Sequence, residues 1–183
     1  TFGRVDILVN NAWGGSRYAR LEQKTDASIE LALRMGVFGA FWAMQAAFPH
    51  MRKNGGGRII TMCSLNGVNA HMYTAEYNIA KEAMRTLTRS AAREWAQYNI
   101  LANIICPAAA TPSSDKFSRY DPENAAKVLK QNPMGRLGDP ERDIGGVALF
   151  LASDDSCYVT GNTIFTDGGA HINGVSWAPE LPE

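Results

Sequence analysis

The chain carries the stretch GGGRIITMCS at residues 55–64 and, thirteen positions beyond its last serine, the stretch YNIAK at residues 77–81 (77 − 64 = 13). The glycines favour a turn, and the apolar run behind them is typical of a buried β-strand that ends at Ser64. The step of four from Tyr77 to Lys81 puts both side chains on one helix face, one turn apart. A strand ending in serine therefore leads into a helix carrying tyrosine and lysine, and strand carboxyl ends are where open α/β sheets bind ligands.

These three residue types suit proton transfer. An unperturbed tyrosine titrates near ~10, and a neighbouring lysine cation lowers that pKa. A phenol tuned toward neutral pH can give or take a proton during turnover, and the Ser64 hydroxyl can polarise the same substrate oxygen. A Tyr-x-x-x-Lys pattern alone occurs by chance on many exposed helices, so the position of Ser64 is what favours a site here.

Strands and helices alternate along the rest of the chain. Residues 108–133 form a long connection with a short helix near 122–130, and connections of this length are usually lids or binding loops. Alternation of this kind predicts a parallel sheet with helices on both faces. The predicted strands are 6–10, 58–63, 100–106 and 163–166, and the predicted longer helices are 27–53, 77–98 and 141–152.

Several ordered motifs resemble those of the short-chain dehydrogenase/reductase family, over almost all 183 residues. The stretch VDILVNNA at 5–12 resembles a strand that ends in Asn-Asn-Ala-Gly, and NIICP at 103–107 resembles the strand before a Pro-Gly turn. The stretches GRLGDPE at 135–141 and VTG to DGG at 159–169 are similar to the family's C-terminal pattern. The resemblance implies an α/β fold with a Rossmann-like, doubly wound parallel sheet in three α/β/α layers.

A protein of this family would begin with a strand, a glycine-rich turn and a helix, and the turn holds the cofactor's pyrophosphate. This chain opens on Thr1-Phe2-Gly3, immediately before the family's fourth strand. We therefore expect residues 1–183 to be the C-terminal two-thirds of a single dinucleotide-binding and catalytic domain, without the first strands. The residue that selects NAD or NADP would lie in the absent part, so the choice cannot be read.

The resemblance implies an NAD(P)-dependent oxidoreductase that transfers a hydride between nicotinamide and a ketone or secondary alcohol. Tyr77 would be the general acid or base, Lys81 would lower the Tyr77 pKa and bind the nicotinamide ribose, and Ser64 would orient the substrate oxygen. The residues expected along the cofactor are Asn11, Ala12, Tyr77, Lys81, Pro107, Ala108, Ala110 and Thr111, and residues 108–133 would be the substrate-side loop.

The chain departs from the family pattern at several places. Gly36 aligns with an Asn that in the family helps to hold a water relaying protons to the lysine, and its other possible role is close helix packing. Trp13 stands where the Asn-Asn-Ala-Gly motif has its glycine. The Pro-Gly turn is Pro-Ala at 107–108. The family's threonine usually comes five residues after that proline, whereas Thr111 comes four after (111 − 107 = 4). Ser113 is therefore a rival to Thr111 for the contact with the cofactor's carboxamide.

Composition excludes several classes of partner. Lys plus Arg and Asp plus Glu each number 18, so there is no electrostatic case for nucleic acid or an anionic membrane. The three cysteines show no paired spacing, and two lie in apolar strands, which predicts buried reduced thiols. The histidines are scattered, so no metal is expected. The richest apolar stretch, 37–48, is too short to span a bilayer, and we expect a cytoplasmic protein.

Helices 27–53 and 77–98 carry more apolar residues than one buried face needs, and in the resembled family the equivalent helices pair across a two-fold axis. This implies a homodimer or homotetramer.

Tyr73 is a rival to Tyr77 as the acid, although no lysine follows it at 77. His71 could face substrate, and an apolar pocket could be lined by Trp13, Met72, Phe117 and Tyr120.

Two function classes remain open. The chain is either part of an oxidoreductase acting on an apolar ketone or secondary alcohol, or a catalytically silent structural or interaction subunit. Gly36, Ala108 and the missing glycine loop favour the silent subunit. Ser64, Tyr77 and Lys81 favour the enzyme, because an unused site has no physical need for all three at this spacing.

Overall fold

The structure, a computed structural model, describes residues 3–14 and 17–172. Four parallel strands form one sheet in the order β1-β2-β3-β4. The predicted parallel sheet is confirmed, and each predicted strand is present to within about one residue. Parts of the expected domain 1–183, including Thr1-Phe2, lie outside the described residues. The strands are β1 (Ile7–Asn10), β2 (Gly57–Met62), β3 (Ile100–Pro107) and β4 (Thr163–Thr166).

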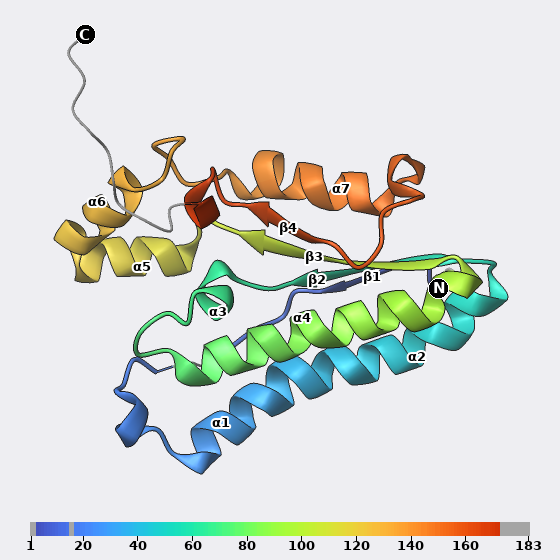
Figure 1. Ribbon diagram of the computed structural model, residues 1–183, viewed down its shortest axis with the longest axis horizontal. Helices are drawn as coiled ribbons and strands as arrows, with labels where there is room; N and C mark the ends of the chain where they lie inside the picture. Colours follow the sequence, from blue (N-terminus) through green and yellow to red (C-terminus); the bar gives the residue numbers. More distant parts are fainter. Residues whose placement is uncertain (1–2, 15–16, 173–183) are drawn as a thin grey trace, which may run out of the picture.

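Helices cover both faces of this sheet, so the three-layer α/β/α architecture is confirmed (Figure 1). One face carries α1 (Asp26–Ala32), α2 (Gly39–Lys53) and α4 (Ala75–Trp95), and the other carries α7 (Gly146–Ala152). The remaining helices are α3 (Leu65–Val68), α5 (Pro112–Tyr120) and α6 (Pro122–Lys130), with short 3₁₀ turns at Leu21–Gln23, Ala96–Tyr98, Asp154–Ser156 and Ala170–Ile172.

Two predicted helices contain a wider turn. The predicted helix 27–53 is present but passes through a π-helix at Leu33–Phe38, between α1 and α2. The predicted helix 141–152 begins as a π-helix at Pro140–Gly145 before α7. Single π-turns inserted in helices are frequent at functional sites, and the first of them contains Gly36.

Helix α5 was not predicted, because residues 108–121 were expected to be loop. Its start has a clear local cause: Pro112 occupies the first turn, where a missing N–H is harmless. Thr111 and Ser114 form a capping box, in which each side chain bonds the other residue's backbone N–H. The short helix predicted near 122–130 is confirmed as α6.

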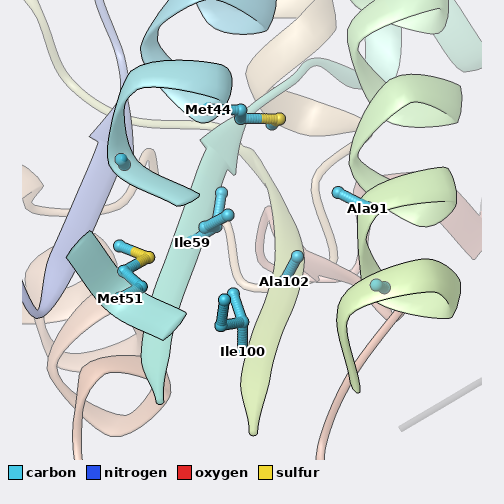
Figure 2. Close-up of a cluster of buried hydrophobic side chains, with 8 residues drawn as sticks. Met44, Met51, Ile59, Ala91, Ile100 and Ala102 are labelled. Atoms are coloured by element: carbon cyan, nitrogen blue, oxygen red, sulfur yellow. The ribbon is translucent and has the colours of Figure 1, made fainter. Parts of the chain in front are cut away.

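The central strands β2 and β3 are mostly apolar because both of their faces are covered. Figure 2 shows the main cluster, in which Met44 and Met51 of α2 meet Ile59 of β2 and Ile100 of β3, with Ala91 of α4 beside them. At the sheet edge, by contrast, Ile7 and Val9 of β1 are 47% and 49% exposed.

Residues Asp26–Lys53 form one continuous helical stretch that is long and apolar enough, by length and composition, to cross a membrane. This stretch is longer than the apolar segment 37–48 considered from sequence. It lies along the sheet beside α4, with Ala40, Met44, Ala47 and Met51 buried. Its inner face packs on the sheet, while 28% of its most apolar window is buried.

Met44→Ala should leave a cavity between α2 and the sheet and lower the free energy of unfolding by about 2–5 kcal/mol. The matched control is Met72→Ala, because Met72 is 67% exposed and surface changes stay within about 0.5 kcal/mol. Urea denaturation measures both. Equal, small losses would contradict the place of Met44 in the core.

Candidate active site

Ser64, Tyr77 and Lys81 meet at the carboxyl end of β2, as predicted. Ser64 follows β2 and caps α3, where its Oγ accepts a hydrogen bond from the Asn66 N–H at 3.1 Å. Tyr77 and Lys81 lie one turn apart on α4, and the Ser64 side chain is close enough to the Tyr77 phenol to lower its pKa. Ser64 and Lys81 are both buried, at 9% and 3% exposed.

The Lys81 ammonium is held against the sheet. Its Nζ donates a hydrogen bond to the Met62 carbonyl oxygen at 2.7 Å, and lies 5.6 Å from the ring centroid of Tyr77. Burial lowers the pKa of Lys81, and the nearby thiols of Cys63 and Cys106 oppose that shift. Both cysteines are buried and free, as predicted for the apolar strands.

The pKa of Tyr77 differs from the expectation. Burial raises it above its ordinary value, because the phenolate loses solvation, and the hydrogen bond with Ser64 offsets part of that rise. The lowered pKa predicted from Lys81 is therefore wrong for the chain in this state. The physical reason is that desolvation of the partly buried phenol outweighs the contribution of Ser64, and the Lys81 cation is itself bound to the Met62 carbonyl.

A buried ion pair fixes the first turn of α4, directly before Tyr77. The Glu76 carboxylate accepts from Lys24 Nζ at 2.5 Å and from the Arg17 N–H at 3.1 Å. The side chains of Glu76 and Lys24 are 2% and 6% exposed, respectively. Burial raises the pKa of Glu76, but the bonds from Lys24 and the backbone outweigh it, so the net shift is downward. No sequence pattern points to this pair, whose members lie 52 positions apart (76 − 24 = 52).

The residues predicted to border the cofactor gather at the same sheet edge. Asn11 and Ala12 follow β1, and Pro107 ends β3. The segment after Pro107 is tied down, since the Ala108 N–H bonds the Thr166 carbonyl at 3.0 Å and the Ala110 N–H bonds the Gly138 carbonyl at 2.8 Å.

The hydroxyl of Thr111 caps α5, and Ser113 is exposed on its first turn. Their individual roles toward a cofactor stay predictions.

Two buried polar atoms at the carboxyl ends of strands, Asn10 Nδ2 and Thr166 Oγ1, have no hydrogen-bond partner within the described residues. Such atoms fit a polar ligand lying along this edge.

A pocket of about 550 Å³ is lined by Asn66, two residues after Ser64, and by residues of α5 and α6. Phe117 and Tyr120 line it, as predicted, and His71 also faces it. Tyr18 and Tyr73 line it as well; Tyr73 had been considered only as a rival acid. The full lining is Tyr18, Asn66, His71, Tyr73, Phe117, Tyr120, Asp121, Asn124 and Val128.

The other two predicted pocket residues lie elsewhere. Met72 is 67% exposed. Trp13 packs edge-on against the ring of Tyr77, with centroids 5.0 Å apart. Gly36 is buried against Trp13 and α4, which confirms its role in close packing.

Known proteins resemble the chain over most of its length. The profile of the family described as enoyl-(acyl carrier protein) reductase matches residues 1–171. The chain is 37% identical over 168 residues to 12alpha-hydroxysteroid dehydrogenase from Clostridium sp., covering 92% of this chain and 64% of that enzyme. It is 36% identical over 173 residues to a 3-oxoacyl-[acyl-carrier-protein] reductase from Thermotoga maritima, covering 93% and 68%.

Solved structures share the fold. Levodione reductase superposes with a TM-score of 0.87 at 31% identity, covering 94% of this chain and 69% of that one. A gluconate 5-dehydrogenase from Burkholderia cenocepacia, solved with NADP and tartrate, gives a TM-score of 0.82 at 36% identity, covering 92% and 66%. The chain thus spans less than two thirds of the length of the hydroxysteroid dehydrogenase and about two thirds of the others.

Glu76→Gln should lower the free energy of unfolding by about 3–5 kcal/mol at neutral pH, because it leaves the buried Lys24 charge without its partner. The lowered Glu76 pKa means that this stabilisation is present above the unfolded pKa of about 4.3 and is lost as pH falls through the folded value. The difference between wild type and variant should therefore shrink in acid, as measured by urea denaturation across pH.

The matched control is Glu82→Gln, which removes the partly exposed pair of Glu82 with Arg85. Pairs of that kind contribute about 0–1 kcal/mol. A Glu76→Gln loss no larger than this control, or one that is independent of pH, would contradict the role given to the buried pair.

Proposed function

Because the chain belongs to the short-chain dehydrogenase/reductase family, we propose that it forms the catalytic and substrate-binding part of an NAD(P)-dependent oxidoreductase acting on a ketone or secondary alcohol. The observation that carries this proposal is that Ser64, Tyr77 and the buried Lys81 lie together at the carboxyl end of β2. The NADP named in the structure of the gluconate 5-dehydrogenase supports the class of cofactor.

The nicotinamide, when bound, supplies or accepts the hydride, and the chain supplies the proton and the geometry. In reduction the Tyr77 hydroxyl gives its proton to the substrate oxygen, and in oxidation the phenolate takes it back. Ser64 donates a second hydrogen bond to that oxygen and stabilises the charge that develops on it. Lys81, fixed by the Met62 carbonyl, keeps a positive charge near the phenol.

The raised pKa of Tyr77 suits its role as an acid. Burial favours the neutral phenol, so Tyr77 holds a proton for reduction over the whole neutral range. Oxidation needs the phenolate, so its rate should rise with pH toward the Tyr77 pKa. The interaction of Ser64 with the phenol limits that rise in the pKa of Tyr77.

The substrate side is formed by residues 108–133, which we place over the pocket. Four aromatic rings line this space, from Tyr18, Tyr73, Phe117 and Tyr120. Such walls bury apolar surface and orient flat molecules. We therefore propose an apolar ketone or alcohol, in keeping with the hydroxysteroid dehydrogenase among the relatives.

The alternative is a catalytically silent subunit, favoured by Gly36 in place of the family's Asn and by Ala108 in place of its Gly. Titration of the full-length protein with NADH and NADPH separates the two proposals. Binding of neither cofactor would support the silent subunit.

We also propose a homodimer or homotetramer. The outer face of Asp26–Lys53 carries a stripe of apolar side chains that are 37–50% exposed. We call it the outer stripe, and its members are Leu31, Met35, Phe38, Phe41 and Trp42. Contiguous exposed apolar surface of this kind marks interaction sites.

Tyr77→Phe in the full-length protein keeps the ring and removes the proton, so turnover should fall by roughly 10²–10⁴-fold while the fold is unchanged by circular dichroism. Tyr73→Phe is the control, because Tyr73 lies in the pocket without a lysine one turn later. Near-wild-type turnover of Tyr77→Phe, or an equal loss in both variants, would remove Tyr77 from the mechanism.

Light scattering of the full-length protein at micromolar concentration should report a dimer or tetramer. Trp42→Glu places a charge in the outer stripe and should shift the mass toward the monomer, whereas Tyr158→Glu, at a side chain that is 99% exposed, should not. A wild-type protein that is only monomeric contradicts this assembly.

A further inference from the structure

Gly36 has no side chain because Trp13 occupies the space beside it. A Cβ added to Gly36 would lie 2.9 Å from Cζ3 of Trp13, 3.2 Å from Sδ of Met84 and 3.4 Å from Cβ of Ala80. The segment around Gly36 is helical, so the local backbone gives no reason for a glycine. The indole ring of Trp13 and the glycine are therefore a matched pair, in contact between the segment after β1 and the π-helix that contains Gly36.

The same indole contacts two of the three candidate catalytic residues. Its ring meets that of Tyr77 edge-to-face, with an interplanar angle of 84°. Lys81 Nζ lies 5.2 Å from the Trp13 ring centroid, within the range of a cation–π interaction. Trp13 thus touches the tyrosine ring and the lysine ammonium at once.

We propose that Trp13 is a positioning residue of this active site, admitted by Gly36, whose indole ring orients the Tyr77 ring and holds the Lys81 ammonium at the sheet edge. The role rests on the proposed function of Ser64, Tyr77 and Lys81. Trp13 acts through these residues and has no proton to exchange with the substrate.

The surroundings of Lys81 explain why an aromatic face matters. The ammonium is 3% exposed and its hydrogen bond to the Met62 carbonyl comes from the sheet side. The titratable groups that face it are the thiols of Cys63 and Cys106 and the phenol of Tyr77 on its own helix. All three are neutral when protonated, so the negative face of the indole favours the charged lysine where burial opposes it.

The first test measures the titration of Lys81 in the full-length protein without cofactor, by competitive labelling of amines with a trace reagent across pH and peptide mass spectrometry. Trp13→Leu fills much of the volume but has no π face, and should lower the Lys81 midpoint by about 0.4–1.5 pH units. Trp13→Phe keeps a smaller aromatic face and should recover part of the shift. A midpoint unchanged in Trp13→Leu would overturn the proposal.

The second test measures the coupling between the two positions by thermal unfolding. Gly36→Ala should destabilise the wild type, where the new Cβ meets the indole, and should be neutral or stabilising in a Trp13→Ala background. Gly146→Ala is the matched control, since a Cβ there meets nothing within 4 Å. Equal effects of Gly36→Ala in both backgrounds would show that the two positions are independent.

These readouts separate the proposal from the proposed function. If the full-length protein shows no nicotinamide-dependent turnover, or if Tyr77→Phe leaves turnover intact, the proposed function fails while the titration and the coupling still report on Trp13. If turnover depends on Tyr77, but the Lys81 midpoint is unchanged in Trp13→Leu and Gly36→Ala has the same effect in both backgrounds, then Trp13 only fills space in the packing. In the active enzyme, the pH profile of kcat/KM for Trp13→Leu should shift with the Lys81 midpoint.

Discussion

A buried ammonium at the end of β2 is the constraint on which this site depends. A charge so far from water needs partners on several sides, and Lys81 finds a carbonyl from the sheet and an aromatic face from the loop after β1. Both partners lie at the carboxyl edge of the sheet, so the lysine ties α4 to that edge. Helix geometry then fixes Tyr77 one turn earlier, within reach of the serine that follows β2.

Much of the fold could be predicted from sequence because its signals are local. The apolar runs at 58–63 and 100–106 predict strands covered on both faces, and they became β2 and β3. Helix α5 was missed because its amphipathic pattern is short and polar, although the capping signal Thr111-Pro112 could have located its start. The π-turn at Leu33–Phe38 leaves no periodic signature, since it adds only a slight offset to a long helical pattern.

The candidate site, too, could be predicted where its signals are local in sequence and not where they depend on the assembled fold. Ser64, Tyr77 and Lys81 were found from spacing, because a strand end and a helix turn set their positions. The pKa of Tyr77 was mispredicted because burial is a property of the assembled fold, and here burial is the largest cause of the raised pKa. The sequence marked Trp13 and Gly36 as two separate departures, and only the three-dimensional contact shows that each accounts for the other. Lys24 and Glu76 were invisible for the same reason, as partners distant in sequence.

The wall of the pocket also contains a strained residue. Tyr73 adopts a φ of 68°, in the left-handed region, and Ala70 nearby has a φ of 51°. Only glycine occupies that region without strain, yet a glycine at 73 would remove one of the aromatic rings that line the pocket. Backbone strain and the aromatic wall of the pocket are therefore tied together at a single residue. A change at 73 that relaxes the backbone also alters the shape of this space, while Ser64, Tyr77 and Lys81 stay as they are.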